Sequence, residues 1–212
     1  MRRPARSTDS FIPSHLSLPT LREAAARCTG CDLYKQATQT VFGEGATQAS
    51  ILLVGEQPGD QEDRAGHPFV GPAGKILDKA LTEAGIDRRD LYVTNAVKHF
   101  KWEPQGKRRK HKKPSAAEIA ACRPWLEAEL QVVQPRVVVC LGATAAQSVF
   151  AKAVRLGDMR GRAWSTPHAA SVFVTVHPSA ILRHPESAQR EQEYRRFVRD
   201  LHHITSYLRK AA

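Results

Sequence analysis

The sequence predicts an α/β protein, a three-layer α/β/α sandwich built on a central four-stranded parallel sheet. Short runs rich in valine, isoleucine and leucine, each too short for a helix, alternate along the chain with longer segments of helical periodicity. This alternation is typical of buried parallel strands that are joined by crossover helices. The chain has 212 residues, of which 42% are hydrophobic, so it is long enough to bury one sizeable core.

Four strands and four helices follow from this pattern. The expected strands cover residues 51–55, 91–97, 136–142 and 172–177. The expected helices cover residues 71–84, 115–133, 143–149 and 186–208. Gly85 ends the first of these helices, and Ser115 with Glu118 forms a capping box at the start of the second.

The ends of the chain and its composition favour one soluble domain. Residues 1–19 are rich in Arg, Ser and Pro and lack the apolar stretch of a signal peptide, so we expect a flexible basic arm there and a single domain over residues 20–212. No run approaches the roughly 18 apolar residues of a membrane span. These features predict a cytoplasmic protein, and nothing in the sequence predicts more than a monomer.

A run of positive charge points to a polyanionic partner. The net charge is +11, and eight Lys or Arg residues lie between Lys98 and Pro114. A solvated basic face is the common explanation of such a run. Here Trp102, His99 and His111 are interleaved with the cations, which suits a nucleic-acid strand better than a membrane surface.

Three segments are expected to meet at the carboxyl edge of the sheet, where open α/β sheets build their sites. The first is the acidic glycine turn EQPGDQED with HPFVGPAG, residues 56–74, and the others are residues 95–114 and HPSAILR, residues 177–183. The middle segment contains about 17 residues without a secondary-structure pattern, which in a compact domain indicates a functional loop.

The four cysteines are free buried thiols or a metal site. Cys28 and Cys31 form a CxxC pair, and Cys122 and Cys140 are separated by 17 residues. Disulfides are improbable in a cytosolic enzyme. Spacing alone leaves both choices open, and zinc and an iron–sulfur cluster both accept four thiolates.

Taken together, the motifs resemble a known family. The CxxC pair, GEQPGDQED, HPFVGPAG, YVTNAVKHF, CRPWL and HPSAILR stand in the order of the iron–sulfur uracil-DNA glycosylases of family 4, from about residue 28 to about residue 200. Gln57, where family 4 typically has alanine, and the inserted KRRKH, residues 107–111, resemble the UdgX branch, which becomes covalently attached to uracil-containing DNA. The resemblance implies a uracil-DNA glycosylase-like fold and a [4Fe-4S] cluster on Cys28, Cys31, Cys122 and Cys140.

The resemblance also implies a flipped uracil and roles for the residues around it. Breaking the glycosidic bond leaves positive charge on the sugar and negative charge on the base, so a donor is needed near the base oxygen. His177 would hydrogen-bond uracil O2, the Asn95 amide would pair with N3–H and O4, and Phe69 would stack on the base. The implied uracil pocket is Gly55, Glu56, Gln57, Phe69, Asn95 and His177. The implied DNA contacts are Lys107, Arg108, Arg109, Lys110, Ser179 and Arg183.

His111 occupies the position of the UdgX histidine that attacks C1′ of the sugar. By composition alone it is one more polar residue in a phosphate-binding run. We expect Arg109, Lys110 and Lys112 to disfavour its imidazolium form and so keep it nucleophilic, and Glu56 to orient its ring. Lys110 stands where the UdgX loop more often has isoleucine.

Three functions therefore compete. The first is a UdgX-like suicide glycosylase with His111, Glu56, His177 and Asp60 as catalytic residues, and we expect it to accept single-stranded DNA. The second is a turnover family 4 enzyme that releases uracil and an abasic site, with a water near the Glu56–Asp60 turn as nucleophile. The third is a basic iron–sulfur module that binds nucleic acid without catalysis.

Overall fold

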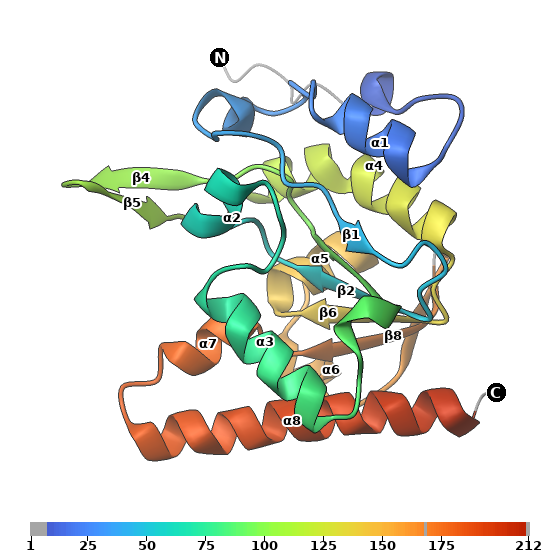
Figure 1. Cartoon of the computed structure of the whole chain (residues 1–212), viewed down its shortest axis with the longest axis vertical. Coiled ribbons are helices and arrows are strands. Elements are labelled where there is room, and N and C mark those ends of the chain that lie inside the picture. The colour runs from blue at the N-terminus through green and yellow to red at the C-terminus, as the bar shows by residue number, and fades with distance from the viewer. Residues whose placement is uncertain (1–7, 168, 211–212) are drawn as a thin grey trace.

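The computed structural model describes residues 8–167 and 169–210, and its core is a six-stranded sheet in the order β1-β3-β2-β6-β8-β7 (Figure 1). The strands of this sheet are β1 (Glu44–Gly45), β2 (Ile51–Gly55), β3 (Leu91–Asn95), β6 (Val137–Leu141), β7 (Trp164–Thr166) and β8 (Ala169–Thr175). The four central strands β3, β2, β6 and β8 are parallel, as the sequence predicts. The edge strands β1 and β7 pair antiparallel with them, so the sheet is mixed and larger than the predicted four strands.

Helices cover both faces of the sheet and complete the three layers (Figure 1). One face packs on α3 (Pro72–Glu83), α7 (Pro178–Leu182) and α8 (Ser187–Lys210), and the other on α4 (Ala116–Val133) and α5 (Ala143–Phe150). Strand β6 alternates between the two cores: Val137, Val139 and Leu141 face the first, and Val138 and Cys140 face the second. The shorter helices are α1 (Leu18–Ala25), α2 (Asp60–Ala65), α6 (Leu156–Met159) and the 3-10 helices Asp9–Phe11, Asp32–Lys35 and Arg88–Asp90.

The strand order creates a crevice at the carboxyl ends of β2 and β6. The chain leaves β2 for β3 on one side through α3, and then crosses through α4 to β6 on the other side of β2. Such a switch point is where ligands bind in open α/β sheets. The loops after β2, β3, β6 and β8 all open at this edge.

The long basic loop is not structureless, which corrects the expectation for residues 95–114. It forms the hairpin β4 (Trp102–Gln105) and β5 (Arg108–His111), in which Trp102 lies opposite His111. The hairpin projects from the sheet beside α2 (Figure 1). A four-residue strand made of Lys, Arg and His carries no apolar alternation, so the sequence pattern could not show it.

The predicted flexible arm, residues 1–19, is described only from residue 8 onward. Residues 1–7 lie outside the described residues. From residue 8 onward the chain packs on the domain: Thr8 is buried and its hydroxyl donates to Ala121 O at 2.6 Å. Ser17 then caps α1, whose apolar side packs on α4. Within the described part of the chain, every helix is too short or too polar to cross a bilayer.

Candidate active site

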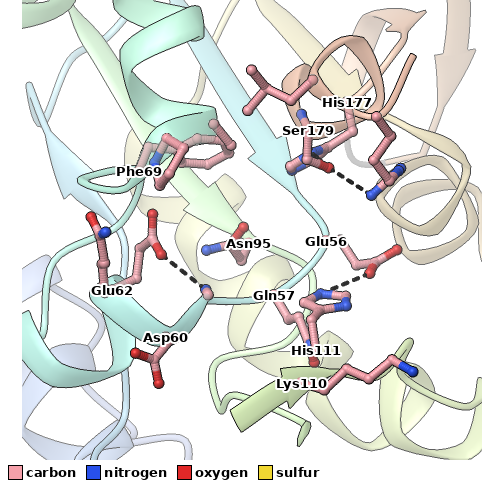
Figure 2. Close-up of a pocket in the computed structure, with 16 residues that line it drawn as sticks. Glu56, Gln57, Asp60, Glu62, Phe69, Asn95, Lys110, His111, His177 and Ser179 are labelled. Atoms are coloured by element: carbon pink, nitrogen blue, oxygen red, sulfur yellow. Dashed lines mark hydrogen bonds and ion pairs between the residues drawn. The ribbon is translucent and has the colours of Figure 1, made fainter. Parts of the chain in front are cut away.

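A cavity of about 630 Å³ opens at the carboxyl edge of the sheet, in the size range of small-molecule pockets. It is lined from four directions, by the turn after β2, the end of β3, hairpin strand β5 and the loop after β8 (Figure 2). The three segments that the sequence analysis expected to converge do meet here. Among the predicted residues, the lining contains Glu56, Gln57, Asp60, Phe69, Asn95, Lys110, His111, His177, Ser179 and Arg183.

The floor of the cavity depends on close packing around Gly55. A Cβ at this position would lie 2.3 Å from Asn95 Oδ1 and 2.5 Å from Phe69 Cζ, so only glycine allows both side chains to approach β2. Phe69 has a left-handed backbone with a φ of 58°, and its ring stacks on His177 with 6.0 Å between centroids. A Cβ at Gly74 would collide with Phe69 O. The two glycines therefore hold an aromatic wall beside the Asn95 amide.

Glu62 is a pocket residue that the site prediction missed. Its side chain is 8% exposed, and its carboxylate accepts the N–H of Gly59 at 3.1 Å and the N–H of Gly71 at 2.8 Å. One buried side chain thus ties the acidic turn to the loop that carries Phe69 (Figure 2). The signal was present in the sequence, because Glu62 stands at the third position of α2 where a capping-box carboxylate belongs.

His177 is held as a neutral donor. Its Nδ1 accepts the N–H of Ser179 at 3.2 Å and lies 2.8 Å from Ser179 Oγ, which in turn accepts from Arg183 Nη1 at 3.2 Å. An Nδ1 that accepts leaves the proton on Nε2. Burial, with smaller contributions from Arg183 and His111, lowers the pKa of His177 to about 4. The ring therefore presents a neutral N–H to the cavity near neutral pH.

Glu56 lies between a hydroxyl and an imidazole. Thr144, at the start of α5, donates to Glu56 Oε2 at 2.5 Å. On the other side, His111 Nε2 lies 3.4 Å from Glu56 Oε1 (Figure 2). The carboxylate thus bridges the crevice between β2 and β6 and meets the hairpin. Thr144 is a second residue that the sequence reasoning missed, because nothing in GATAAQ singles out a threonine.

The pKa of His111 is lowered, as predicted, but for a different reason. Partial desolvation at the pocket wall is the main cause, Glu56 opposes it, and Arg183 from the loop after β8 adds to it, while the His111 side chain stays 46% exposed. The expected contribution of neighbouring cations is wrong for this geometry. Arg109 points into α2, and Lys110 and Lys112 are directed to Glu103, with Nζ–O distances of 4.0 and 2.9 Å.

Gln57 anchors the base of the hairpin. Its Nε2 donates to Lys101 O at 3.1 Å and to Lys112 O at 3.2 Å, and its Oε1 accepts the N–H of Lys101 at 3.1 Å. Both amide protons are used, so the side chain ties the residues that flank the two hairpin strands to the turn after β2 and has no free donor for a base. A contact between Gln57 and uracil stays a prediction, and it would come from the Gln57 backbone.

Arg109, predicted as a DNA contact, is engaged within the fold by two carboxylates of α2. Its guanidinium donates to Asp60 Oδ1 at 2.5 Å and to Asp63 Oδ2 at 2.6 Å, and it lies over the rings of Phe100 and Trp102. The side chain is only 15% exposed. Arg109 is two residues before His111 on β5, so both side chains lie on the inner face of the hairpin.

Asp60 remains at the pocket but as part of this ion-pair network. Its carboxylate binds Arg109 and also Arg64, 3.0 Å away, and these hydrogen bonds outweigh desolvation and lower its pKa. The cations Lys107, Arg108 and Lys110 are exposed on the hairpin, where a nucleic acid could reach them.

Three of the four cysteines lie together. Cys28, Cys31 and Cys122 pack in one cluster with α1 and α4, where Trp125 Nε1 donates to Cys28 Sγ and Lys98 N to Cys122 Sγ, both at 3.3 Å. Burial raises the pKa of Cys122 to about 12 and raises that of Cys31.

Cys140 lies apart from the other three, in the core between β6 and α5. The described residues contain no group of three or more metal-binding side chains arranged for an ion. Cys28, Cys31 and Cys122 share one cluster of side chains and are the candidate ligands among the predicted four, whereas Cys140, in the other core, does not join them.

Comparisons with known proteins agree with this geometry. Residues 42–202 match the model of the uracil DNA glycosylase superfamily. The chain belongs to this superfamily. It is 38% identical over 190 residues to the type-4 uracil-DNA glycosylase of Thermotoga maritima, covering 89% of this chain and 93% of the relative. It is 35% identical over 177 residues to the type-4 enzyme of Pyrobaculum aerophilum, covering 80% and 87%. The type-5 enzyme of Thermus thermophilus is 34% identical over 126 residues, only 52% of this chain.

The pocket presents a neutral N–H donor from His177, the amide of Asn95, which makes no hydrogen bond through its side chain among the described residues, and the aromatic face of Phe69. A flat heterocycle with an N–H and carbonyl oxygens matches these three groups.

We expect Arg109→Met to release the hairpin. The substitution removes both contacts to the α2 carboxylates and leaves Asp63 buried without its cation. Hydrogen exchange of amides in residues 101–112 should become faster. Arg108→Met, the neighbouring and exposed position, is the matched control and should leave the exchange unchanged. Equal protection in both variants would show that Arg109 does not hold the hairpin.

Stability should fall as the pH drops from 6.5 to 4.5. The pKa values of His177 and His99 are lowered by burial to about 4 in the folded chain, against an ordinary value near 6.5. The unfolded chain therefore takes up protons in this window that the folded chain refuses, and the free energy of unfolding decreases. Urea unfolding at several pH values measures the slope. His99→Gln should make it shallower, and a flat profile for the unmodified protein would contradict the assignment.

Proposed function

We propose that this chain is a uracil-DNA glycosylase that excises a flipped uracil and then becomes bonded to C1′ of the sugar through His111. The observation that carries the proposal is the position of His111, on the wall of the pocket that holds Asn95 and His177, with its Nε2 3.4 Å from Glu56. The type-4 glycosylase relatives support uracil excision. The bond to the enzyme rests on the hairpin geometry.

The first step breaks the bond between C1′ and N1 of uracil. The bonding electron pair leaves with the base, and the negative charge is shared with O2, where the neutral Nε2–H of His177 can donate. The Asn95 amide offers its carbonyl to N3–H and its NH₂ to O4, a pattern that cytosine mismatches. Phe69 stacks on the ring. Charge develops in a site whose donors are fixed beforehand by Gly55 and the Ser179 cap, which is the arrangement that stabilises a leaving anion.

The second step captures the sugar cation. An unprotonated nitrogen of His111 supplies its lone pair to C1′, a C–N bond forms, and the positive charge passes from the sugar to the imidazole ring. The proton on the other ring nitrogen then leaves, and uracil acquires a proton at N1. Glu56, held by Thr144, stabilises the ring as this charge develops. A lowered pKa keeps the lone pair of His111 available at neutral pH.

The alternative is turnover catalysis, in which water takes the place of His111. The type-4 names of the relatives favour it, since they describe glycosylase activity and nothing further. Glu56 would then orient the water. Asp60 could assist only while its carboxylate stays paired with Arg109 and Arg64.

A denaturing gel distinguishes the two. A labelled single-stranded oligonucleotide with one uracil is mixed with the protein and with His111→Ala. We expect a heat-resistant shifted band that is absent in the variant, and formation of this band should persist from pH 8 to 6. An unshifted, alkali-labile oligonucleotide from the unmodified protein would establish turnover, and an acidic optimum well below pH 6 would contradict a neutral nucleophile. Intact DNA in both lanes would contradict glycosylase activity and favour a protein that only binds nucleic acid.

Thr144→Val should slow the reaction about 10- to 100-fold, because a misoriented Glu56 no longer faces His111. Thr144→Ser keeps the hydroxyl and is the matched control. The measurement is the single-turnover rate at saturating protein, together with the affinity for uracil-containing DNA. A loss of affinity without a loss of rate would show that Thr144 serves binding only.

We also propose that Cys28, Cys31 and Cys122 hold an iron–sulfur cluster with a structural role. The two N–H donors to sulfur and the packing of these thiols between α1 and α4 support it. When bound, the cluster would tie the amino-terminal segment to α4, and no step of the reaction passes through it. Single-stranded DNA as substrate, a monomeric state and a cytoplasmic, nucleoid-associated location remain predictions of the sequence.

A further inference from the structure

An ion pair with almost no exposure to solvent lies directly behind the pocket. Lys98 Nζ and Glu129 Oε2 are 2.5 Å apart, and their side chains are 1% and 0% exposed. Removing two charges from water carries a large desolvation cost, and a well-packed apolar pair often serves stability as well or better. The pair therefore calls for an explanation other than stability.

The geometry of the lysine supplies one. Its Nζ donates to Thr94 Oγ1 at 2.6 Å and to Asn95 O at 2.8 Å in addition to Glu129, so all three ammonium protons are used. Asn95 is the last residue of β3, and its backbone carbonyl receives a charged donor. The ammonium thus fixes the peptide unit from which the Asn95 side chain enters the pocket.

The carboxylate is fixed just as completely. Glu129 Oε1 accepts from Tyr92 Oη at 3.0 Å, from Thr94 Oγ1 at 2.9 Å and from Gly43 N at 3.1 Å. A Cβ at Gly43 would lie 2.4 Å from this oxygen, so the chain passes the carboxylate as closely as it can. Neither ion can shift without breaking several bonds.

The backbone of Lys98 is pinned as well. Its N–H donates to Cys122 Sγ, and its carbonyl accepts the N–H of Val41 at 2.8 Å. The four residues from Asn95 to Lys98 are therefore held at both ends. The Lys98 ammonium holds the carbonyl of Asn95, and Cys122 Sγ holds the N–H of Lys98. Between them, Ala96 N and Val97 N donate to Gly55 O and Glu56 O in the first pocket segment.

We propose that Lys98, with Glu129, is a positioning residue for base recognition, which holds the Asn95 amide at the uracil edge without touching the substrate. This inference rests on the proposed function. The buried pair then has a role in the chemistry of the pocket, because the orientation of the Asn95 side chain depends on the charge that binds the Asn95 carbonyl.

The test replaces both ions, since one alone would leave a buried unpaired charge. In Lys98→Met/Glu129→Gln, the introduced amide keeps an oxygen for Tyr92 and Gly43 while the donor to Asn95 O is lost. We expect the single-turnover rate on a uracil oligonucleotide to fall about 10- to 100-fold. The affinity for an oligonucleotide with a tetrahydrofuran abasic analogue should not change, because no base is present for Asn95.

The interaction with Asn95 is isolated by a double-mutant cycle. In an Asn95→Ala background the paired substitution should cause no further loss of rate. Tyr92→Phe is the matched control: it removes a bond to the same carboxylate, lowers the melting temperature and should leave the rate unchanged. Equal losses with and without Asn95, or parallel losses of rate and abasic-analogue affinity, would show a merely structural role and overturn the inference. An unmodified protein that leaves the uracil oligonucleotide intact would instead refute the proposed function.

Discussion

The β4–β5 hairpin reaches the pocket because two side chains fasten it there, and the site depends on this attachment. Gln57 bonds Lys101 and Lys112, the residues that flank the two strands at the base of the hairpin, and Arg109 of β5 bonds the α2 carboxylates. An isolated two-stranded hairpin is marginal in water, and this one is rich in like charges. Without the two anchors, His111 would have no fixed relation to Glu56.

The pocket is built from rigid contacts on three sides and one adjustable charge. Gly55 and Gly74 set the aromatic wall by close packing, Glu62 joins two glycine loops through their amides, and the Ser179 cap sets the tautomer of His177. These contacts are satisfied within the fold and cost little to maintain once it has formed. Among the described pocket residues, Glu56 meets both the hydroxyl of Thr144 and the half-exposed imidazole of His111, so a substrate can change the electrostatics mainly at this carboxylate.

The central sheet was readable from the sequence because buried parallel strands are continuous apolar runs, and the pocket edge followed from them. Asn95, His177, Phe69 and Glu56 stand where the motifs place them. Local patterns could not show the hairpin, because β5 contains no apolar residue, or the inward turn of Arg109, whose partners are about 46 to 49 residues away in the chain. For Cys140 the spacing in the sequence fits a metal ligand, but its place on β6 directs its thiol into an apolar core away from the other cysteines.

The inward pairing of cations changes how strongly this protein should feel ionic strength. Of the eight cations between Lys98 and Pro114, Lys98, Lys101, Arg109, Lys110 and Lys112 face carboxylates, and within the described chain only Lys107, Arg108 and Lys113 lack one. Each phosphate neutralised by a free cation releases a counterion, and each paired cation must first give up its carboxylate. The number of cations in this run therefore overestimates the counterion release that the proposed binding of DNA would cause, and retention of DNA would depend more on the shape of the pocket.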